Sequence, residues 1–257
     1  MVVMTLPKQL EESTILTQRQ LGDCVYLATF SAPEIAKLAK PGQFIQVRIQ
    51  HGDVMLRRPF GVAAVDRDHQ TITMIYRKIG HGTRILSEML PGEEVNILGP
   101  LGHGFRTDVK HPLLIGGGVG LAPLLFYAAA LKGKVDVIMG GRNEDEMFWV
   151  NLFRPYVKNV YVTTDDGSMG TKGFPTTILP QILEKEDYDS IAVCGPEIMM
   201  RGVAKIAKEH NVPCEVSLEK RMGCGLGACL SCAIDTTKGR KKVCKDGPVF
   251  PAEEVFA

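Results

Sequence analysis

The stretch PLLIGGGVGLAP, residues 112–123, decides the fold of this chain. Residues 112–115 are typical of a buried strand, and residues 121–131 are predicted to form a helix. Between the two lie four glycines: Gly116, Gly117, Gly118 and Gly120. A glycine turn from a strand into a helix predicts a pyrophosphate site, because backbone N–H groups and the helix dipole meet there. The run does not fit G-x-G-x-x-G, so a purely structural turn is the alternative.

Strands and helices are predicted to alternate after this turn. The predicted strands are 135–140, 160–163 and 191–194. The predicted helices lie near 145–153, 176–183 and 197–210. This alternation indicates a parallel sheet covered by helices.

Before the turn, short strands and few helices are expected. The predicted strands are 26–30, 44–49, 71–77 and 94–100, and Pro-Gly pairs precede two of them at 41–42 and 91–92. Frequent short strands of this kind predict an antiparallel β-barrel or a sandwich.

The ends of two α/β strands carry residues that could contact a nicotinamide nucleotide. Glu144 and Asp145 follow the second strand, where they would repel a 2′-phosphate, whereas Arg142 would attract one. We therefore expect NAD rather than NADP, with a solvated helix start as the alternative. Cys194 ends a later strand and is a candidate for nicotinamide contact.

The barrel half contains one basic motif, Arg57-Arg58-Pro59-Phe60-Gly61. An arginine in a loop fixed by proline can hold a diphosphate through charge-assisted hydrogen bonds. A solvated basic turn is the alternative for this motif taken alone.

Four cysteines near the C-terminus form a second motif. Cys224, Cys229, Cys232 and Cys244 have the spacing C-x4-C-x2-C-x11-C. A C-x4-C-x2-C run with a distant fourth cysteine is the plant-type pattern for a [2Fe–2S] cluster held by four thiolates. The residues between the first three are mostly small, and we expect the fourth ligand to come from a later strand or turn.

Zinc and disulfides are the alternatives for these cysteines. Structural zinc usually uses two C-x2-C knuckles, and only one is present here. The chain has seven cysteines and its start lacks a signal-peptide pattern, so a disulfide framework is disfavoured and a reducing cytoplasm is expected.

Composition limits the partners. The 257 residues are 45% hydrophobic and 23% charged, with a net charge of +1, which gives no electrostatic case for nucleic acid or membrane binding. No apolar run approaches the ~20 residues of a membrane-spanning helix.

Several of these motifs together resemble a known superfamily. They are Arg58 to Gly61, Gly82-Thr83, the run Gly99 to Gly102, the glycine turn, and Val193 to Pro196. Their order and spacing over nearly the whole chain are similar to those of ferredoxin–NADP reductase-like proteins. The run from Ser217 to Cys229 resembles most the electron-transfer subunits of B-type, NAD-dependent dihydroorotate dehydrogenases.

The resemblance implies cofactors and their sites. FAD would be bound by three groups of residues. Its phosphates and flavin would contact Arg58, Pro59, Phe60 and Gly61, and its flavin and ribityl chain would contact Ile75, Tyr76 and Arg77. Its pyrophosphate would be held by Gly82 and Thr83. The four cysteines would hold the [2Fe–2S] cluster, and NAD would be a diffusible substrate.

The resemblance also implies a function in pyrimidine biosynthesis. A partner catalytic subunit containing FMN would oxidise dihydroorotate, and electrons would pass through the cluster and FAD to NAD⁺. Two copies of each subunit would form a heterotetramer. The alternative is a flavin and iron–sulfur subunit of another NAD(P)H-dependent ferredoxin reductase or of a hydrogenase.

Three domains follow: an FAD-binding antiparallel barrel over residues 1–103, an NAD-binding α/β domain over 104–211, and a [2Fe–2S] domain over 212–257.

Overall fold

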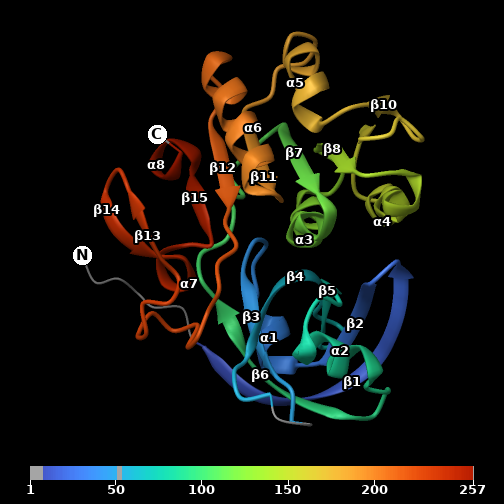
Figure 1. Cartoon of the computed structure of the whole chain (residues 1–257), viewed down its shortest axis with the longest axis vertical. Coiled ribbons are helices and arrows are strands. Elements are labelled where there is room, and N and C mark those ends of the chain that lie inside the picture. The colour runs from blue at the N-terminus through green and yellow to red at the C-terminus, as the bar shows by residue number, and fades with distance from the viewer. Residues whose placement is uncertain (1–7, 51–53, 257) are drawn as a thin grey trace.

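A computed structural model describes residues 8–50 and 54–256 and contains the three expected parts. Figure 1 shows the barrel at the bottom, the α/β sheet with its helices above it, and the C-terminal hairpin beside both. The fold class predicted from the sequence, an N-terminal antiparallel barrel followed by a parallel α/β domain and a small iron–sulfur domain, is confirmed.

The barrel closes through six antiparallel strands in the order β1-β2-β5-β4-β3-β6. They are β1 (Gln9–Gly22), β2 (Val25–Ser31), β3 (Phe44–Arg48), β4 (Arg58–Asp66), β5 (Thr71–Arg77) and β6 (Glu94–Leu101). Alternate residues such as Ile45, Val47 and Met74 fill the interior, as the period of two requires. Their neighbours Gln46 and Arg48 face outward from the barrel.

Two features of the barrel differ from the expectation. Strand β1 was not predicted, because its sequence is mostly polar and only Ser13 and Ile15 in it are buried. Arg58 to Gly61 lie on strand β4, not in a loop, and pair with β3. The strand therefore fixes the direction of the Arg58 side chain.

The barrel also carries two short helices, α1 (Pro33–Leu38) and α2 (His81–Glu88). Thr83 stabilises the start of α2, because its Oγ1 accepts hydrogen bonds from the backbone N–H groups of Ile79 and Gly80, each at 3.0 Å. This side-chain contact positions the Gly82-Thr83 pair at a helix N-terminus.

The α/β domain has a seven-stranded sheet in the order β10-β9-β8-β7-β11-β12-β15. Its strands are β7 (Pro112–Gly117), β8 (Asp136–Gly141), β9 (Val160–Thr164), β10 (Thr171–Lys172), β11 (Ser190–Cys194), β12 (Cys214–Ser217) and β15 (Val249–Pro251). All neighbouring pairs are parallel except β12 with β15.

Helices cover both faces of this sheet. On the barrel side lie η1 (Gly118–Gly120), α3 (Leu121–Leu131), η2 (Glu144–Phe148) and α4 (Trp149–Phe153); on the other side lie α5 (Pro175–Leu183) and α6 (Glu197–Glu209). Leu114 packs toward α3, whereas Leu113 and Ile115 pack toward α5 and α6. Alternate side chains of one strand thus enter two cores, which explains the continuous apolar run.

Helix α3 joins the sheet to the barrel. Almost all of its residues are buried, and it contacts β4, where a Cβ on Gly61 would lie 3.4 Å from Pro123. The glycine of the FAD motif therefore allows the two domains to approach closely.

The C-terminal part consists of β13 (Ala233–Thr236), β14 (Gly239–Lys242), α7 (Val243–Asp246) and α8 (Ala252–Val255) around a segment without regular structure, residues 218–232. Cys244 lies in the short helix α7, so the expectation of a strand or turn at the fourth cysteine is wrong. The three domain boundaries stay predictions, and strands β12 and β15 join the sheet although both follow residue 212.

None of the helices among the described residues is long and apolar enough to cross a membrane.

Candidate functional site

A cavity of about 1040 Å³ lies between the barrel, the start of α3 and the segment that follows β12. All nine predicted FAD residues line it: Arg58, Pro59, Phe60, Gly61, Ile75, Tyr76, Arg77, Gly82 and Thr83. Cys194 lines it as well. The structure therefore brings together residues from β4, β5, α2 and β11 at one site of dinucleotide size.

Arg58 and the start of α2 form the cationic end of the cavity. A Cβ on Gly82 would lie 2.9 Å from Arg58 Nε, so the guanidinium lies directly against the helix N-terminus. The first turn of a helix presents N–H groups without intrahelical acceptors, and the guanidinium adds charge and further donors. This end of the cavity can bind a diphosphate.

The Thr83 hydroxyl makes hydrogen bonds within the loop before α2. Besides accepting two backbone hydrogen bonds, it donates to the carbonyl of Gly80 at 3.1 Å. The side chain thus shapes the loop before α2, and the backbone of the Gly82-Thr83 pair is the part that faces the cavity.

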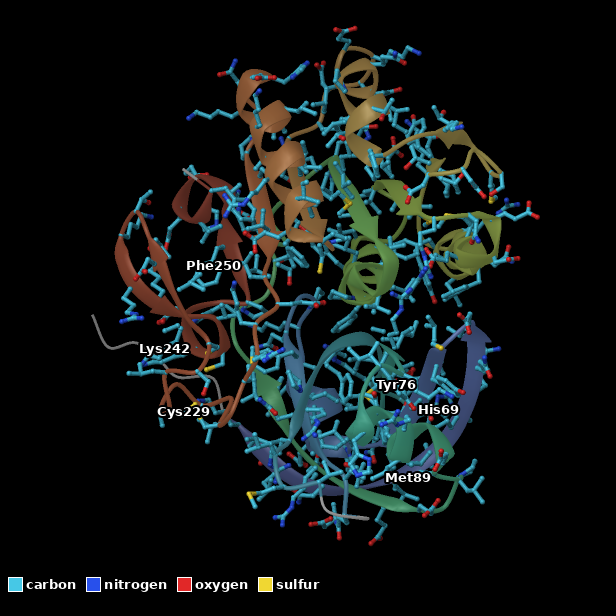
Figure 2. The ribbon with its side chains drawn as sticks, in the orientation of Figure 1. His69, Tyr76, Met89, Cys229, Lys242 and Phe250 are labelled. Atoms are coloured by element: carbon cyan, nitrogen blue, oxygen red, sulfur yellow. The ribbon has the colours of Figure 1, made fainter. Side chains whose placement is uncertain are left out.

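Aromatic side chains line the middle of the cavity. The rings of Phe60 and Tyr76 lie 5.5 Å apart, and Tyr76 stacks on Tyr26 at 5.8 Å. Burial strongly raises the pKa of Tyr76, so its hydroxyl stays protonated. Figure 2 shows Tyr76 in the part of the barrel that faces the α/β domain. A flat, apolar ring system such as a flavin fits this surface.

Arg77 connects the barrel to the α/β domain. Its Nη2 lies 3.3 Å from Glu146 Oε1, and the same carboxylate accepts a hydrogen bond from Arg142 Nε at 2.7 Å. Arg142 is therefore engaged with Glu146, while Glu144 and Asp145 stay exposed. This arrangement is consistent with NAD rather than NADP, because the attraction of Arg142 for a 2′-phosphate is already offset by Glu146.

The four glycines of the turn do not line the cavity directly. A Cβ on Gly120 would lie 2.5 Å from the carbonyl oxygen of Cys194, and one on Gly116 would lie 2.4 Å from Leu121. Both glycines permit close packing of the turn against its neighbours. Gly118 differs, since it has a φ of +56° and open space in the Cβ direction. It is the glycine of the run best placed to face a nucleotide.

Cys194 lies opposite Gly120 at the end of β11. It is buried, and burial strongly raises the pKa of its thiol. Cys194 is therefore a neutral thiol beside the cavity and can make van der Waals contact with a nicotinamide ring.

One wall of the cavity was missed by the sequence analysis. Residues 217–222, which run from the last residue of β12 into the segment after it, line it together with Val119, Ala122 and Pro123. Within this wall, Glu219 is open to the cavity, and desolvation by the surrounding protein raises the pKa of its carboxyl. The end of a parallel strand is where such sheets bind ligands, so the end of β12 was the available signal.

The same wall continues into the cysteine segment. Met222 lines the cavity, and Cys224 follows two residues later. Gly225 has a φ of +68°, and a Cβ there would lie 2.6 Å from Gln46 Nε2. The segment from Cys224 to Cys232, called the cluster loop below, thus rests on the outer face of the barrel.

Backbone N–H groups point at the cysteine sulfurs in this loop. The N–H groups of Leu226 and Ala228 each lie 3.3 Å from Cys224 Sγ. A hydrogen bond with Ser231 and backbone N–H groups lower the pKa of Cys229 to about 6, whereas burial raises the pKa of Cys244 to about 12. Donors aimed at sulfur favour thiolates, the form that binds iron.

The four cysteines lie in two pairs. The N–H of Cys224 donates to Cys229 Sγ at 3.4 Å, and the N–H of Cys244 donates to Cys232 Sγ at 3.4 Å. Among the described residues, no three His, Cys, Asp or Glu side chains are close enough to hold a single metal ion. Two pairs of cysteines match the ligand set of a [2Fe–2S] cluster, which takes two thiolates on each iron.

The outer edge of the loop is open to solvent. Cys229 is exposed, and Figure 2 shows it at the outer edge of the C-terminal part. Lys242 connects the neighbouring hairpin to the loop, because its Nζ donates to the carbonyl of Gly227 at 2.7 Å.

Comparison with known proteins identifies the family. The chain is 38% identical over 254 residues to the electron transfer subunit of dihydroorotate dehydrogenase B (NAD(+)) from Desulforamulus reducens, covering 95% of this chain and 97% of that protein. The chain belongs to this family. The corresponding subunit from a Geobacillus species is 36% identical over 95% of this chain and 98% of its own length.

Family models agree with this membership. Residues 219–256 match the iron–sulfur cluster binding domain of dihydroorotate dehydrogenase B, and residues 114–205 match the oxidoreductase NAD-binding domain. The chain is therefore an NAD-linked oxidoreductase subunit with an iron–sulfur cluster binding domain.

Solved structures share the fold. An NADH-dependent reduced ferredoxin-NADP oxidoreductase has a TM-score of 0.86 and 31% identity, covering 95% of this chain and 90% of that one. A ferredoxin NADP⁺ reductase from Neisseria gonorrhoeae, with bound FAD and NADP, has a TM-score of 0.65 at 17% identity, covering 78% of this chain and 91% of that chain. The second likeness concerns the fold alone.

Proposed function

We propose that this chain takes electrons from an FMN-containing catalytic subunit that oxidises dihydroorotate and delivers them to NAD⁺. The names of its relatives support a dihydroorotate dehydrogenase complex. The balanced reaction is dihydroorotate plus NAD⁺ to orotate, NADH and a proton. Two electrons pass through this chain for each NADH formed.

One observation carries the proposal: a single segment lines the flavin cavity and then becomes the cluster loop. Residues 217–222 form a cavity wall, and Cys224 begins the loop. When bound, FAD supplies the exchange between single electrons and hydride that an iron–sulfur cluster and NAD⁺ require. The two cofactor sites are adjacent in sequence and in space, as a relay needs.

The chain's own residues then have distinct roles. Arg58 and the N-terminus of α2 bind the FAD diphosphate, and Phe60 and Tyr76 orient the flavin ring. Gly118 and Cys194 lie on the side where the nicotinamide nucleotide enters. Cys224 and Cys229 would supply one pair of thiolates to the cluster, and Cys232 and Cys244 the other.

The assembly we propose is a heterotetramer of two copies of each subunit, working in the cytoplasm in pyrimidine biosynthesis. Seven free cysteines, with no disulfide among the described residues, suit a reducing compartment.

A second candidate is favoured by the similarity to the NADH-dependent ferredoxin-NADP oxidoreductase. In that case the partner would exchange electrons with ferredoxin, and no dihydroorotate would be used.

Co-expression with the candidate catalytic subunit distinguishes the two. We expect a complex containing FMN and FAD that forms NADH from dihydroorotate and NAD⁺. A complex that reduces ferredoxin but leaves dihydroorotate unchanged would contradict the proposal and support the second candidate.

A further inference from the structure

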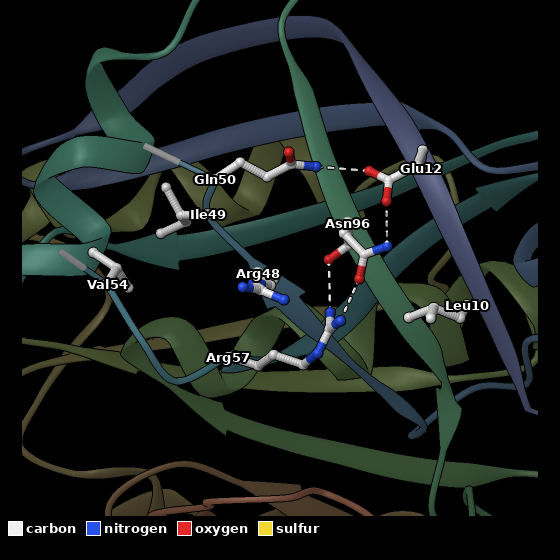
Figure 3. A pocket seen from close by; sticks show the side chains of 8 residues that line it. All are labelled: Leu10, Glu12, Arg48, Ile49, Gln50, Val54, Arg57 and Asn96. Atoms are coloured by element: carbon white, nitrogen blue, oxygen red, sulfur yellow. Dashed lines mark hydrogen bonds between the residues drawn. The ribbon is translucent and has the colours of Figure 1, made fainter. Parts of the chain in front are cut away.

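A second hollow, of about 500 Å³, lies on the outside of the barrel, away from the aromatic wall of the flavin cavity. Figure 3 shows its lining from strands β1, β6 and β3 and from the residues before β4. Two arginines, Arg48 and Arg57, face it together with Glu12 and Asn96. Arg57 and Val54 also line the flavin cavity, whereas Arg48, Glu12 and Asn96 have no part in the sites described above.

Arg57 is held in place by neutral groups. Its Nη1 donates to the carbonyl of Asn96 at 2.9 Å and to that of Gln46 at 3.3 Å, and its Nη2 donates to the Asn96 side chain. Desolvation and the nearby charge of Arg48 lower the pKa of Arg57. Among the described residues, no carboxylate is in hydrogen-bond contact with this guanidinium.

Among the residues that the structure describes, Glu12 is the only acid that lines the hollow, and amides occupy both of its oxygens. Asn96 Nδ2 donates to Oε1 and Gln50 Nε2 donates to Oε2, each at 2.7 Å. Arg48 is exposed and makes no side-chain hydrogen bond or ion pair with the described residues. The described residues thus give the hollow two positive charges and one negative charge, and its positive groups keep unused donors.

The hollow adjoins the cluster loop. In the barrel register Arg48 pairs with Asn96 and Gln46 with Leu98, so the two pairs are neighbours on the outer face. Gln46 lies under Gly225 of the cluster loop. Two residues along a strand span roughly 7 Å, so the arginine hollow begins where the cluster loop ends.

Exposed apolar residues flank this region. Leu226 and Leu230 of the cluster loop are exposed, at 43% and 59%, and Leu10 beside the hollow is exposed at 62%. Leucines around a charged centre are typical of a surface that a protein partner covers.

We propose that this hollow is part of the docking surface for the catalytic subunit and takes a carboxylate side chain of that subunit between Arg48 and Arg57. The inference rests on the proposed function. An electron donor must lie against the exposed edge of the cluster loop, and the hollow continues that edge. Arginine forks match carboxylates in charge and shape, and such pairs fix the orientation of the partner.

The test is Arg48→Glu, measured by titrating the purified catalytic subunit with this chain and following dihydroorotate-dependent NADH formation. We expect the apparent affinity to fall by at least about tenfold, because a like charge replaces the attraction. The salt dependence of binding should also become weaker than in the wild type. Iron content, FAD content and NADH oxidation with an artificial dye should not change.

Arg154→Glu is the matched control, since Arg154 is exposed just after α4, on the side of the molecule away from the cluster loop (Figure 1). It should bind the catalytic subunit like the wild type.

Wild-type affinity in Arg48→Glu would overturn this inference and leave the proposed function standing. A change in self-association of the isolated chain, with the complex unaffected, would also overturn it, because the occupant would be a second copy. Failure of the wild-type chain to bind any catalytic subunit would overturn the proposed function first.

Discussion

The flavin cavity and the cluster loop are neighbours, yet the chain builds them in different ways. Strands and helix starts make most of the cavity lining, and apolar cores behind them fix their positions. Residues 218–232 contain no helix or strand, and N–H groups directed at sulfur supply much of their polar contact. One site is shaped by packing; the other takes its shape from glycines and from sulfur ligands.

This difference indicates which site depends on its cofactor. Packing of the barrel against α3 does not need FAD, so the cavity should persist without it. Metal binding and folding are coupled where thiolates must converge on a metal. The cluster loop should therefore lose its order when iron is absent, while the barrel and the sheet keep theirs.

The largest expected effect is that of Cys224→Ser on electron transfer from the partner. We expect dihydroorotate-dependent NADH formation to fall by more than about 100-fold. Loss of a residue that only hydrogen-bonds to a metal ligand typically lowers activity by less than this, and Cys224 is itself a proposed ligand. NADH oxidation with an artificial dye should stay near the wild-type rate, because the flavin cavity is intact. Iron analysis and both assays on one preparation measure this.

Cys24→Ser is the control for that variant, since Cys24 lies in the turn between β1 and β2. Its iron content and both activities should match the wild type. Unchanged coupled activity in Cys224→Ser would contradict the assignment of this cysteine as a ligand.

The second effect concerns the cavity. Arg58→Ala should weaken FAD binding by about 1.5–3 kcal/mol, the range for hydrogen bonds to charged groups. FAD fluorescence on dilution gives the dissociation constant, and iron content should not change. Arg84→Ala, on the exposed side of α2, is the matched control. Equal FAD retention in the two variants would show that Arg58 does not bind the diphosphate.

The third effect separates contact from backbone strain in the C-terminal part. Gly225→Ala places a Cβ 2.6 Å from Gln46 Nε2 at a φ of +68°, whereas Gly239→Ala meets open space at a φ of +92°. Both variants should lose about 1–2 kcal/mol of stability to left-handed strain. Only Gly225→Ala should also lose iron faster during dialysis against a chelator. Equal iron loss from both would argue against support of the loop by Gln46.

The smallest effect is expected at the start of α2. Thr83→Val removes the acceptor for Ile79 and Gly80 and should cost about 1 kcal/mol of stability, as the loss of a helix cap does. Chemical denaturation of the FAD-free protein measures it, with Ser87→Ala at the end of the same helix as the control. A loss no greater than that of Ser87→Ala would mean that the backbone alone fixes the loop.

Much of the fold followed from local patterns in the sequence. Alternation identified the strands around Val47 and Met74, and the run from Pro112 to Gly120 identified the first α/β unit. Strand β1 was missed because its polar residues lie on the outside of the barrel and only the pairing with β2 and β6 makes it a strand. Long-range hydrogen bonding of this kind leaves little local signal.

The candidate site was predictable where a residue type is tied to its chemistry. The spacing of the cysteines and the position of Arg58 are examples. The wall formed by residues 217–222 and the pairing of Arg48 with Asn96 depend on which strands become neighbours, so no local pattern showed them. The roles of Gly116 and Gly120 as packing positions likewise appear only once Leu121 and Cys194 are in place.

The most direct test of the relay is anaerobic reduction of the isolated chain by NADH, followed by optical and electron paramagnetic resonance spectra of the same sample. We predict that bleaching of the FAD absorbance is accompanied by the low-temperature signal of a reduced [2Fe–2S] cluster, and that Cys224→Ser bleaches without this signal. FAD that bleaches fully in the wild type while the iron–sulfur signal stays absent, despite full iron content, would contradict electron exchange between the two sites.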